Sequence, residues 1–349
     1  MIIEYFIKIV HHFYMMMKKI LMIIMANNTL KRNHFYIIVL LFAGFIFVLC
    51  IYIYRLSDSD SYRLLMPSVF HIQSNLQKKG KLLVIFTSFK NDPNKSGIHQ
   101  EVINNWLSHG NDIQPIIFYN QSNPTILDSQ ALNMDWIGLP IGRTNKYGTP
   151  KLKPFYASVT KTVKSQFYGF CNGDILFDDS MKNTLKQILK HKTISKKTAL
   201  VIGRRTNIEY QDYHTFKVSH FNNSNLLNQI ANSKGSLYIK AAEDYFFVYM
   251  PDTFPWNSIK DVVIGRPAYD NYLVSEAIKH NVSVIDATNT ILSVHLTGLD
   301  GNHAGSRNID KAYNIDLIGN TYPYGLGRTS SAQYYTTRDE NGRIIIEKR

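Results

Sequence analysis

A polar triplet, Asn172-Gly173-Asp174, interrupts an apolar run that reads FYGFCNGDILFDD. The Asp174 carboxylate is a hard oxygen ligand of the kind that Mg²⁺ and Mn²⁺ prefer, and Asn172 could add an amide oxygen. Gly173 would let the backbone approach a ligand closely. An Asx-type turn between two strands is the alternative, and the triplet taken alone favours it.

Other polar residues follow apolar runs in the same way. In an open α/β sheet, ligands bind outside the carboxyl ends of the strands, so residues at such ends are expected to converge. They offer carboxylates, a cationic pair and a histidine, which together suit a diphosphate with a divalent metal. These residues are Thr87, Ser88, Arg204, Arg205, Glu243, Asp244 and His295.

The order of elements favours an α/β fold. Residues 81–89 (KLLVIFTSF) predict a strand, residues 96–110 a helix that ends at a glycine, and residues 113–120 a second strand. Such a strand, helix and strand form a parallel pair with a crossover. The alternation continues to about residue 300, which predicts one α/β domain over 81–300. Residues 301–349 are predicted to be a loop and a hairpin packed on that domain.

The run FCNGDILF resembles the aspartate-x-aspartate region of glycosyltransferases with the nucleotide-diphospho-sugar transferase (GT-A) fold. The chain also resembles a little-characterised group of GT-A-like proteins in LLVIFTSFK, VIGRR and IGRPAYDNYLVSEAIKHNVSVIDAT, which together cover about residues 81–300. The resemblance implies a Rossmann-like, mixed but mostly parallel sheet flanked by helices. It also implies a glycosyltransferase that moves a sugar from a nucleotide-diphosphate donor to a hydroxyl of a glycan, glycoprotein or glycolipid acceptor, with Mn²⁺ or Mg²⁺.

The resemblance also assigns roles, position by position. It places Thr87 and Ser88 near the base or ribose of the donor. The remaining donor-binding residues would be Asn172, Gly173, Asp174, Arg204 and Arg205, and the metal ligands Asp174, Asn172 and His295. Many relatives carry Asp where this chain has Asn172, and one carboxylate fewer weakens metal binding.

The acceptor hydroxyl requires a base, and Asp270 in GRPAYDNYL resembles the acid that inverting GT-A enzymes place at a helix start. Glu243 or Asp244 is the second choice. An ordinary acid in the first turn of a helix, stabilised by the helix dipole, is the alternative for Asp270. For Arg204 and Arg205 the alternative is a solvated strand end.

Loss of catalysis is a second functional interpretation, in which the chain is a membrane-anchored, GT-A-like binding protein for a carbohydrate or nucleotide sugar. Asn172 is the feature that favours it, because a protein that only binds has no need of a second metal carboxylate.

Residues 35–54 carry no charge and are long enough for a transmembrane helix, and Lys31 and Arg32 precede them. The pattern predicts a type II signal anchor at 35–54, a cytoplasmic tail at 1–34 and a stem at 55–80. Within the tail, 1–24 could be an upstream extension, with the start at Met1 or Met25. The C-terminal domain would then lie in the lumen of the Golgi or ER, which four N-x-S/T triplets, at Asn94, Asn120, Asn222 and Asn281, support.

Composition sets further limits. With 45% hydrophobic and 19% charged residues, the 349-residue chain is globular rather than disordered. Its net charge is +13, but 6 of these charges come from residues 1–80, and the basic residues form no stripe. We therefore expect no nucleic-acid partner. Cys50 and Cys171 are expected to be free thiols, and the oligomeric state stays open.

Overall fold

The structure is a computed structural model that describes residues 80–209, 221–298 and 301–349. In the described residues, a nine-stranded mixed sheet has the strand order β13-β12-β10-β6-β9-β4-β1-β2-β3. In chain order these strands are β1 (Lys81–Thr87), β2 (Ile113–Tyr119), β3 (Ile137–Pro140), β4 (Ser165–Cys171), β6 (Ala199–Ile202), β9 (Tyr245–Tyr249), β10 (Ser283–Asp286), β12 (Tyr334–Arg338) and β13 (Ile344–Lys348).

The sheet is mostly parallel, as predicted. The first strands, β1 and β2, form a parallel pair in which Leu83 lies opposite Ile113 and Thr87 opposite Ile117, and helix α5 (Ser96–Ser108) connects them. Antiparallel pairing occurs where β9 lies between β4 and β6, and in the β12–β13 hairpin.

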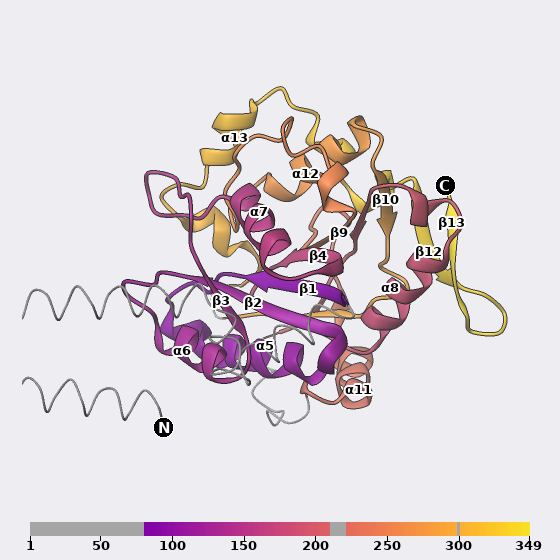
Figure 1. The fold of residues 1–349 in the computed structure, drawn as a ribbon, viewed down its shortest axis with the longest axis horizontal. Coiled ribbons are helices and arrows are strands. Elements are labelled where there is room, and N and C mark those ends of the chain that lie inside the picture. Colours follow the sequence, from indigo (N-terminus) through magenta and orange to yellow (C-terminus); the bar gives the residue numbers. More distant parts are fainter. Residues whose placement is uncertain (1–79, 210–220, 299–300) are drawn as a thin grey trace, which may run out of the picture. The chain divides into compact units, whose positions relative to one another are not determined.

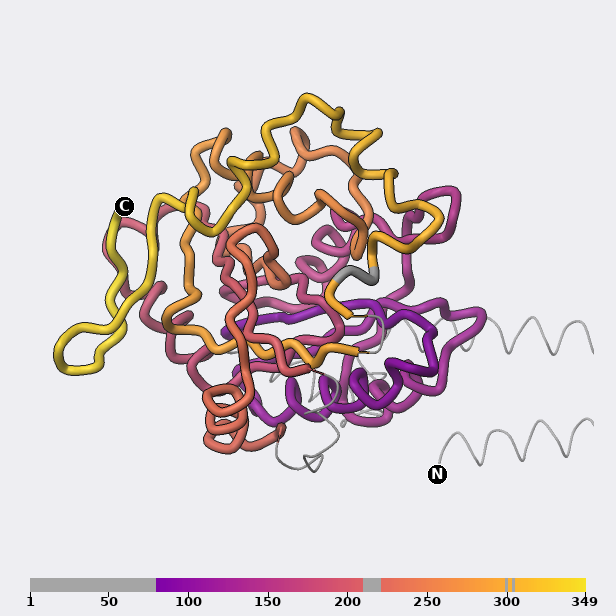
Figure 2. Tube along the Cα trace, turned by 180° about the vertical axis from the view of Figure 1, so that it is seen from behind, coloured from indigo at the N-terminus to yellow at the C-terminus, as the bar shows by residue number. Residues whose placement is uncertain are grey.

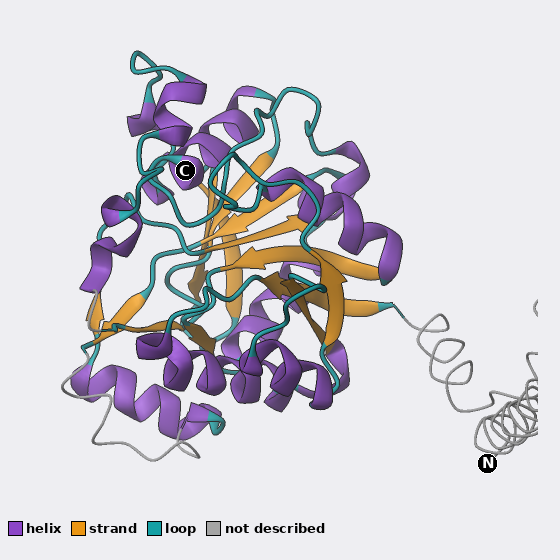
Figure 3. Cartoon of the chain, turned by 90° about the vertical axis from the view of Figure 1, so that its left-hand side faces the viewer, coloured by secondary structure: helices purple, strands orange, loops and turns teal. Residues whose placement is uncertain are grey.

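Helices cover both faces of this sheet, and the alternation of side chains along the strands separates two apolar cores (Figures 1 and 3). On β1, Leu83 and Ile85 belong to one core, while Val84 and Phe86 belong to the other. The first core includes residues of α5, α6 (Ile126–Asn133), α8 (Ser180–Lys190) and α11 (Ser224–Lys234). The second includes residues of α7 (Leu152–Thr162), α12 (Tyr269–Lys279) and α13 (Tyr313–Ile318).

The predicted C-terminal hairpin is present and continues the main sheet. Its first strand, β12, pairs in parallel with β10, and β13 then forms the edge. Figure 2 shows the hairpin in yellow at the left-hand edge of the view. Residues beyond 300 therefore supply two strands of the main sheet as well as a loop.

A second, four-stranded sheet contains β5 (Ile175–Phe177), β11 (Ser293–Leu296), β7 (Thr206–Ile208) and β8 (Ser236–Leu237), in that order. Strand β4 of the main sheet ends at Cys171, and β5 of the second sheet begins at Ile175. The triplet is thus the connection between the two sheets. Its turn is closed by the Ile175 amide, which donates to the Asn172 carbonyl at 3.4 Å. The polar interruption is therefore a backbone turn between two strands, and it lies where those strands meet the cleft.

The predicted location in a Golgi or ER membrane is contradicted. None of the helices in the described ranges is long and apolar enough to cross a bilayer, and α5 has 13 residues where a span needs about 20. The run 35–54, on which the prediction rests, lies outside the described residues, as do the tail, the stem and Cys50. Cys171 is a buried free thiol in the described part of the chain.

Gly169 on β4 tests the packing at the centre of the sheet. It lies opposite Phe247 of β9, and a Cβ atom at position 169 would be 2.1 Å from Phe247 Cδ1. We expect Gly169→Ala to lower the free energy of unfolding by about 1–3 kcal/mol, because an overpacked core must shift. Urea denaturation measures this loss, and adding Phe247→Leu should recover part of it.

Gly325→Ala is the matched control, because no heavy atom among the described residues lies within 4 Å of the Cβ it would add. A Gly169→Ala protein as stable as the Gly325→Ala protein would contradict this account of the β4–β9 contact.

Candidate active site

A cleft of about 630 Å³ opens where the carboxyl ends of β1 and β4 meet the second sheet. Its lining includes every residue that the sequence predicts for the site except Arg204. The expectation that Glu243 and Asp244 follow a strand is wrong: they precede β9 and reach the cleft from its amino end, because β9 runs antiparallel to its neighbours. The predicted residues in the lining are Thr87, Ser88, Asn172, Gly173, Asp174, Arg205, Glu243, Asp244, Asp270 and His295.

Arg204 lies elsewhere. Its Nε donates to the carbonyl of Tyr238 at 2.6 Å, and it lines a separate cavity of about 260 Å³ with Thr288 and Arg338. Adjacent residues of an extended backbone point to opposite sides, so only Arg205 of the predicted pair can face the cleft. The sequence could not show which of the two would do so.

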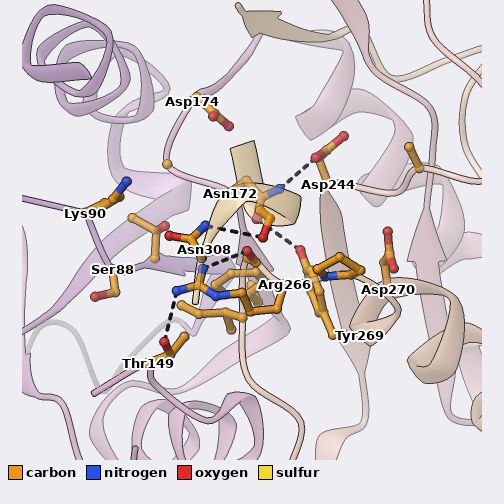
Figure 4. A pocket seen from close by; sticks show the side chains of 18 of the residues that line it. Ser88, Lys90, Thr149, Asn172, Asp174, Asp244, Arg266, Tyr269, Asp270 and Asn308 are labelled. Carbon is orange, nitrogen blue, oxygen red and sulfur yellow. Dashed lines mark hydrogen bonds between the residues drawn. The ribbon is translucent and has the colours of Figure 1, made fainter. Parts of the chain in front are cut away.

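Asp244 is the centre of a buried hydrogen-bond network. Its Oδ1 accepts from Asn172 Nδ2 at 2.7 Å, and both of its carboxylate oxygens lie 2.7 Å from Arg205 Nη1. The Asn172 amide oxygen accepts from the Tyr269 hydroxyl at 3.0 Å. Figure 4 shows Asn172 between Asp244 and Tyr269, with Asp174 apart from that group. The amide of Asn172 is therefore engaged at both ends.

This network explains why an amide suits position 172. A carboxylate there would lie at hydrogen-bonding distance from a second carboxylate, and two such charges repel strongly when they are poorly solvated. Asn172 instead donates a proton, which Asp244 accepts. A second carboxylate, that of Asp244, thus lies beside position 172, although it is absent from the triplet.

Asp174 has His295 and Lys95 at one of its two carboxylate oxygens. Its Oδ2 lies 3.4 Å from His295 Nε2 and 3.5 Å from Lys95 Nζ. Burial works to raise the pKa of Asp174, but His295, Lys95 and Arg205 outweigh it and hold the pKa well below the usual range. The other oxygen, Oδ1, is buried and has no hydrogen-bond partner among the described residues.

The Asp174 carboxylate and the imidazole of His295, whose Nε2 lies 3.4 Å from Asp174 Oδ2, are oxygen and nitrogen ligands that suit a divalent cation with further ligands from a bound phosphate. Within the described ranges, no group of three or more His, Cys, Asp or Glu side chains could hold a metal by itself. A metal at this position would therefore depend on oxygens of the substrate.

Asp270 lies in the first turn of α12, where its Oδ1 accepts from the Asn271 amide at 2.9 Å. The helix begins after a left-handed residue, Ala268 (φ 76°), which follows Gly265 (φ 62°). Burial, with a smaller contribution from Asp244, raises the pKa of Asp270 to about 7. Such a carboxyl group can both take up and release a proton near neutral pH.

Glu243 is more deeply buried, and its Oε1 has no hydrogen-bond partner in the described part of the chain. Burial raises its pKa well above the usual range, and the nearby acids Asp270 and Asp244 add to this effect. Burial and the neighbouring carboxylates therefore favour the protonated form of Glu243, which can donate a hydrogen bond.

The turn that follows β4 packs closely against the end of β1 at Gly173. A Cβ atom there would be 2.8 Å from Phe89 Cδ1 and 3.4 Å from Thr87 Oγ1. Glycine is needed because the turn packs against the end of β1. This contact brings Thr87, which is buried, and the neighbouring Ser88 to the edge of the cleft.

Sequence reasoning missed several cleft residues, chiefly Lys90, Lys95, Arg266 and Tyr269. The two lysines lie in the loop between β1 and α5, and such loops border the ligand site of α/β sheets, which was the available signal. Arg266 is held by Asp310, which also accepts from Thr149 Oγ1 at 2.6 Å. No sequence pattern connects Arg266 with a residue 44 positions away.

Asn172→Asp tests the network around Asp244. We expect it to lower the free energy of unfolding by about 1–3 kcal/mol at pH 7, because two carboxylates would then lie together. The two carboxyl groups would share a proton, which raises the folded-state pKa of one of them above its unfolded value. The loss of stability is therefore small near pH 4 and grows as the pH rises toward the folded-state pKa. Thermal unfolding across this pH range measures it.

Asn172→Ala is the control, because it removes the hydrogen bonds without adding a charge. Its loss of stability should not change in this way with pH. Equal pH profiles for the two variants would show that no charge repulsion acts at position 172.

Comparison with known proteins gives structural neighbours only. No family model and no curated protein matches the sequence. Solved structures that resemble the chain include a putative nucleotide-diphospho-sugar transferase from Desulfovibrio desulfuricans (8% identity, 68% of this chain and 96% of that chain, TM-score 0.33). Others are Staphylococcus aureus TarS in complex with UDP-GlcNAc (13%, 71% and 67%, 0.43) and the mannosyltransferase PcManGT from Pyrobaculum calidifontis in complex with GDP-Man and Mn²⁺ (12%, 76% and 76%, 0.41). These three neighbours are described as a putative nucleotide-diphospho-sugar transferase, a UDP-GlcNAc complex and a mannosyltransferase, and each is at most 13% identical to this chain.

Proposed function

We propose that the protein is a glycosyltransferase that moves a sugar from a nucleotide-diphosphate donor to a hydroxyl of an acceptor. One observation carries the proposal: Asp174 and Asp270 line the same cleft. One oxygen of Asp174 has no hydrogen-bond partner among the described residues, and burial raises the pKa of Asp270 to about 7. The first suits the binding of a diphosphate through a cation, and the second suits removal of a proton from a hydroxyl.

On the donor side, Thr87 and Ser88 would contact the base or ribose, and Asp174 with His295 would hold Mn²⁺ or Mg²⁺. When bound, such a cation supplies positive charge that stabilises the departing diphosphate. Asn172 is given a positioning role, because its amide is engaged with Asp244 and Tyr269. Arg205 holds Asp244 and adds positive charge to the cleft.

On the acceptor side, Asp270 is the proposed base. The acceptor oxygen forms a bond to the sugar carbon, the bond from that carbon to the diphosphate oxygen breaks, and the hydroxyl proton passes to the Asp270 carboxylate. Asp244 is already engaged in a buried ion pair with Arg205, and Glu243 is more deeply buried than Asp270, so Asp270 is the better placed of the three.

Ligand-dependent stability tests the donor site. A ligand that binds the native state raises the melting temperature, so we expect at least one nucleotide sugar to do so for the purified full chain, and more strongly with Mn²⁺ than with EDTA. A screen of UDP-, GDP- and CMP-sugars in which none raises the melting temperature would contradict the proposal.

Asp270→Asn tests the base. We expect it to lower kcat by about 10²–10⁴-fold without loss of folding, because general base catalysis contributes that much. The wild-type rate should rise with pH through about 7, since the base acts only when deprotonated. Sugar transfer and circular dichroism of the same sample measure both effects. Asp174→Ala should abolish transfer too, and full turnover in both variants would disprove the assignment.

A binding protein without catalysis is the second candidate, and the amide at position 172 is the observation that favours it. Release of nucleoside diphosphate in the absence of acceptor separates the two candidates. A transferase hydrolyses its donor slowly, whereas a protein that only binds leaves it intact.

A further inference from the structure

Lys95 pairs with the Asp174 carboxylate inside the cleft. It is the last residue of the 3₁₀ turn Pro93–Lys95, directly before α5, and its ammonium lies 3.5 Å from Asp174 Oδ2. The side chains of Lys95 and Asp174 are only 13% and 17% exposed. Because little water screens this pair, the attraction between its charges is stronger than in a surface salt bridge.

The same ammonium opposes a metal at Asp174. A divalent cation bound to Asp174 and His295 would lie close to Lys95, and like charges repel most strongly where exposure is low. The triplet contains one carboxylate, that of Asp174, because position 172 is an amide. Lys95 therefore adds to His295 and Arg205 in compensating the charge that would attract the metal.

A nucleoside diphosphate changes this balance. Its oxygens provide new acceptors for the ammonium and new ligands for the metal. The flexible four-carbon stem of lysine lets its ammonium move between partners without a change in the backbone. Binding of the diphosphate thus gives Lys95 an alternative to Asp174.

We propose that Lys95 neutralises Asp174 when no donor is bound and turns to the donor diphosphate when it binds, so that nucleotide and divalent cation bind cooperatively. This inference rests on the proposed function. The coupling is reciprocal: the factor by which the nucleotide raises the affinity for metal equals the factor by which metal raises the affinity for nucleotide.

Binding of Mn²⁺ alone provides the test, with the free ion measured by electron paramagnetic resonance and the full chain as the sample. For the wild type, we expect a saturating nucleoside diphosphate of the type that the donor screen identifies to raise the Mn²⁺ affinity by about tenfold or more. For Lys95→Gln, we expect tighter Mn²⁺ binding than in the wild type without nucleotide, weaker nucleotide binding, and a smaller coupling factor.

Three variants control the measurement. Lys95→Arg keeps the charge and should retain most of the coupling. Lys186→Gln removes a lysine outside the cleft lining, which is 50% exposed and pairs with Asp112 at 2.7 Å, and it should leave Mn²⁺ binding unchanged. Asp174→Asn should abolish Mn²⁺ binding with or without nucleotide. Melting curves identify any variant that fails to fold.

Equal Mn²⁺ affinities for wild type and Lys95→Gln in the absence of nucleotide would overturn the inference, as would equal coupling factors. Either result would leave the proposed function intact, provided that nucleotide sugars still bind. Failure of every nucleoside diphosphate and nucleotide sugar to bind, with or without Mn²⁺, would instead overturn the proposed function and the inference with it.

Discussion

The buried ion pair between Arg205 and Asp244 is the interaction on which the cleft depends. It joins the segment between β6 and β7 to the start of β9, so it connects the main sheet with the second sheet at the place where the ligand site lies. Both side chains are almost fully buried. Loss of one partner from such a pair costs about 3–5 kcal/mol, because the other charge is left uncompensated. Asn172 and Tyr269 extend the pair to the triplet and to the helix that carries Asp270.

The cleft contains four acids, Asp174, Glu243, Asp244 and Asp270, whose electrostatic surroundings differ. Asp174 and Asp244 each face cations, whereas Asp270 and Glu243 face burial and the charge of other carboxylates. Groups with pKa values on opposite sides of neutrality divide acid and base roles in many active sites. Here Asp174 keeps a stable negative charge, and Asp270 on α12 has a carboxyl group whose pKa burial raises to about 7.

Residue patterns were sufficient for the α/β order, the parallel β1–β2 pair and the C-terminal hairpin, and all the predicted site residues except Arg204 line one cleft. They worked because strand ends in an α/β sheet converge at one edge, whatever the details of packing. They failed for Arg204, since a local pattern does not fix which of two adjacent arginines faces inward. They also failed for Lys95 and Arg266, whose roles depend on partners 79 and 44 positions away.

The sequence by itself determined that a polar turn follows the strand at Cys171 and that acids, arginines and a histidine lie at strand ends. Periodicity and turn chemistry are local properties of the chain, and residues 167–179 contain them. Only the tertiary structure decided what the triplet does, because that depends on which charges surround it. Asn172 donates a hydrogen bond to Asp244. Asp174 has Lys95 and His295 at Oδ2, while its Oδ1 has no hydrogen-bond partner among the described residues.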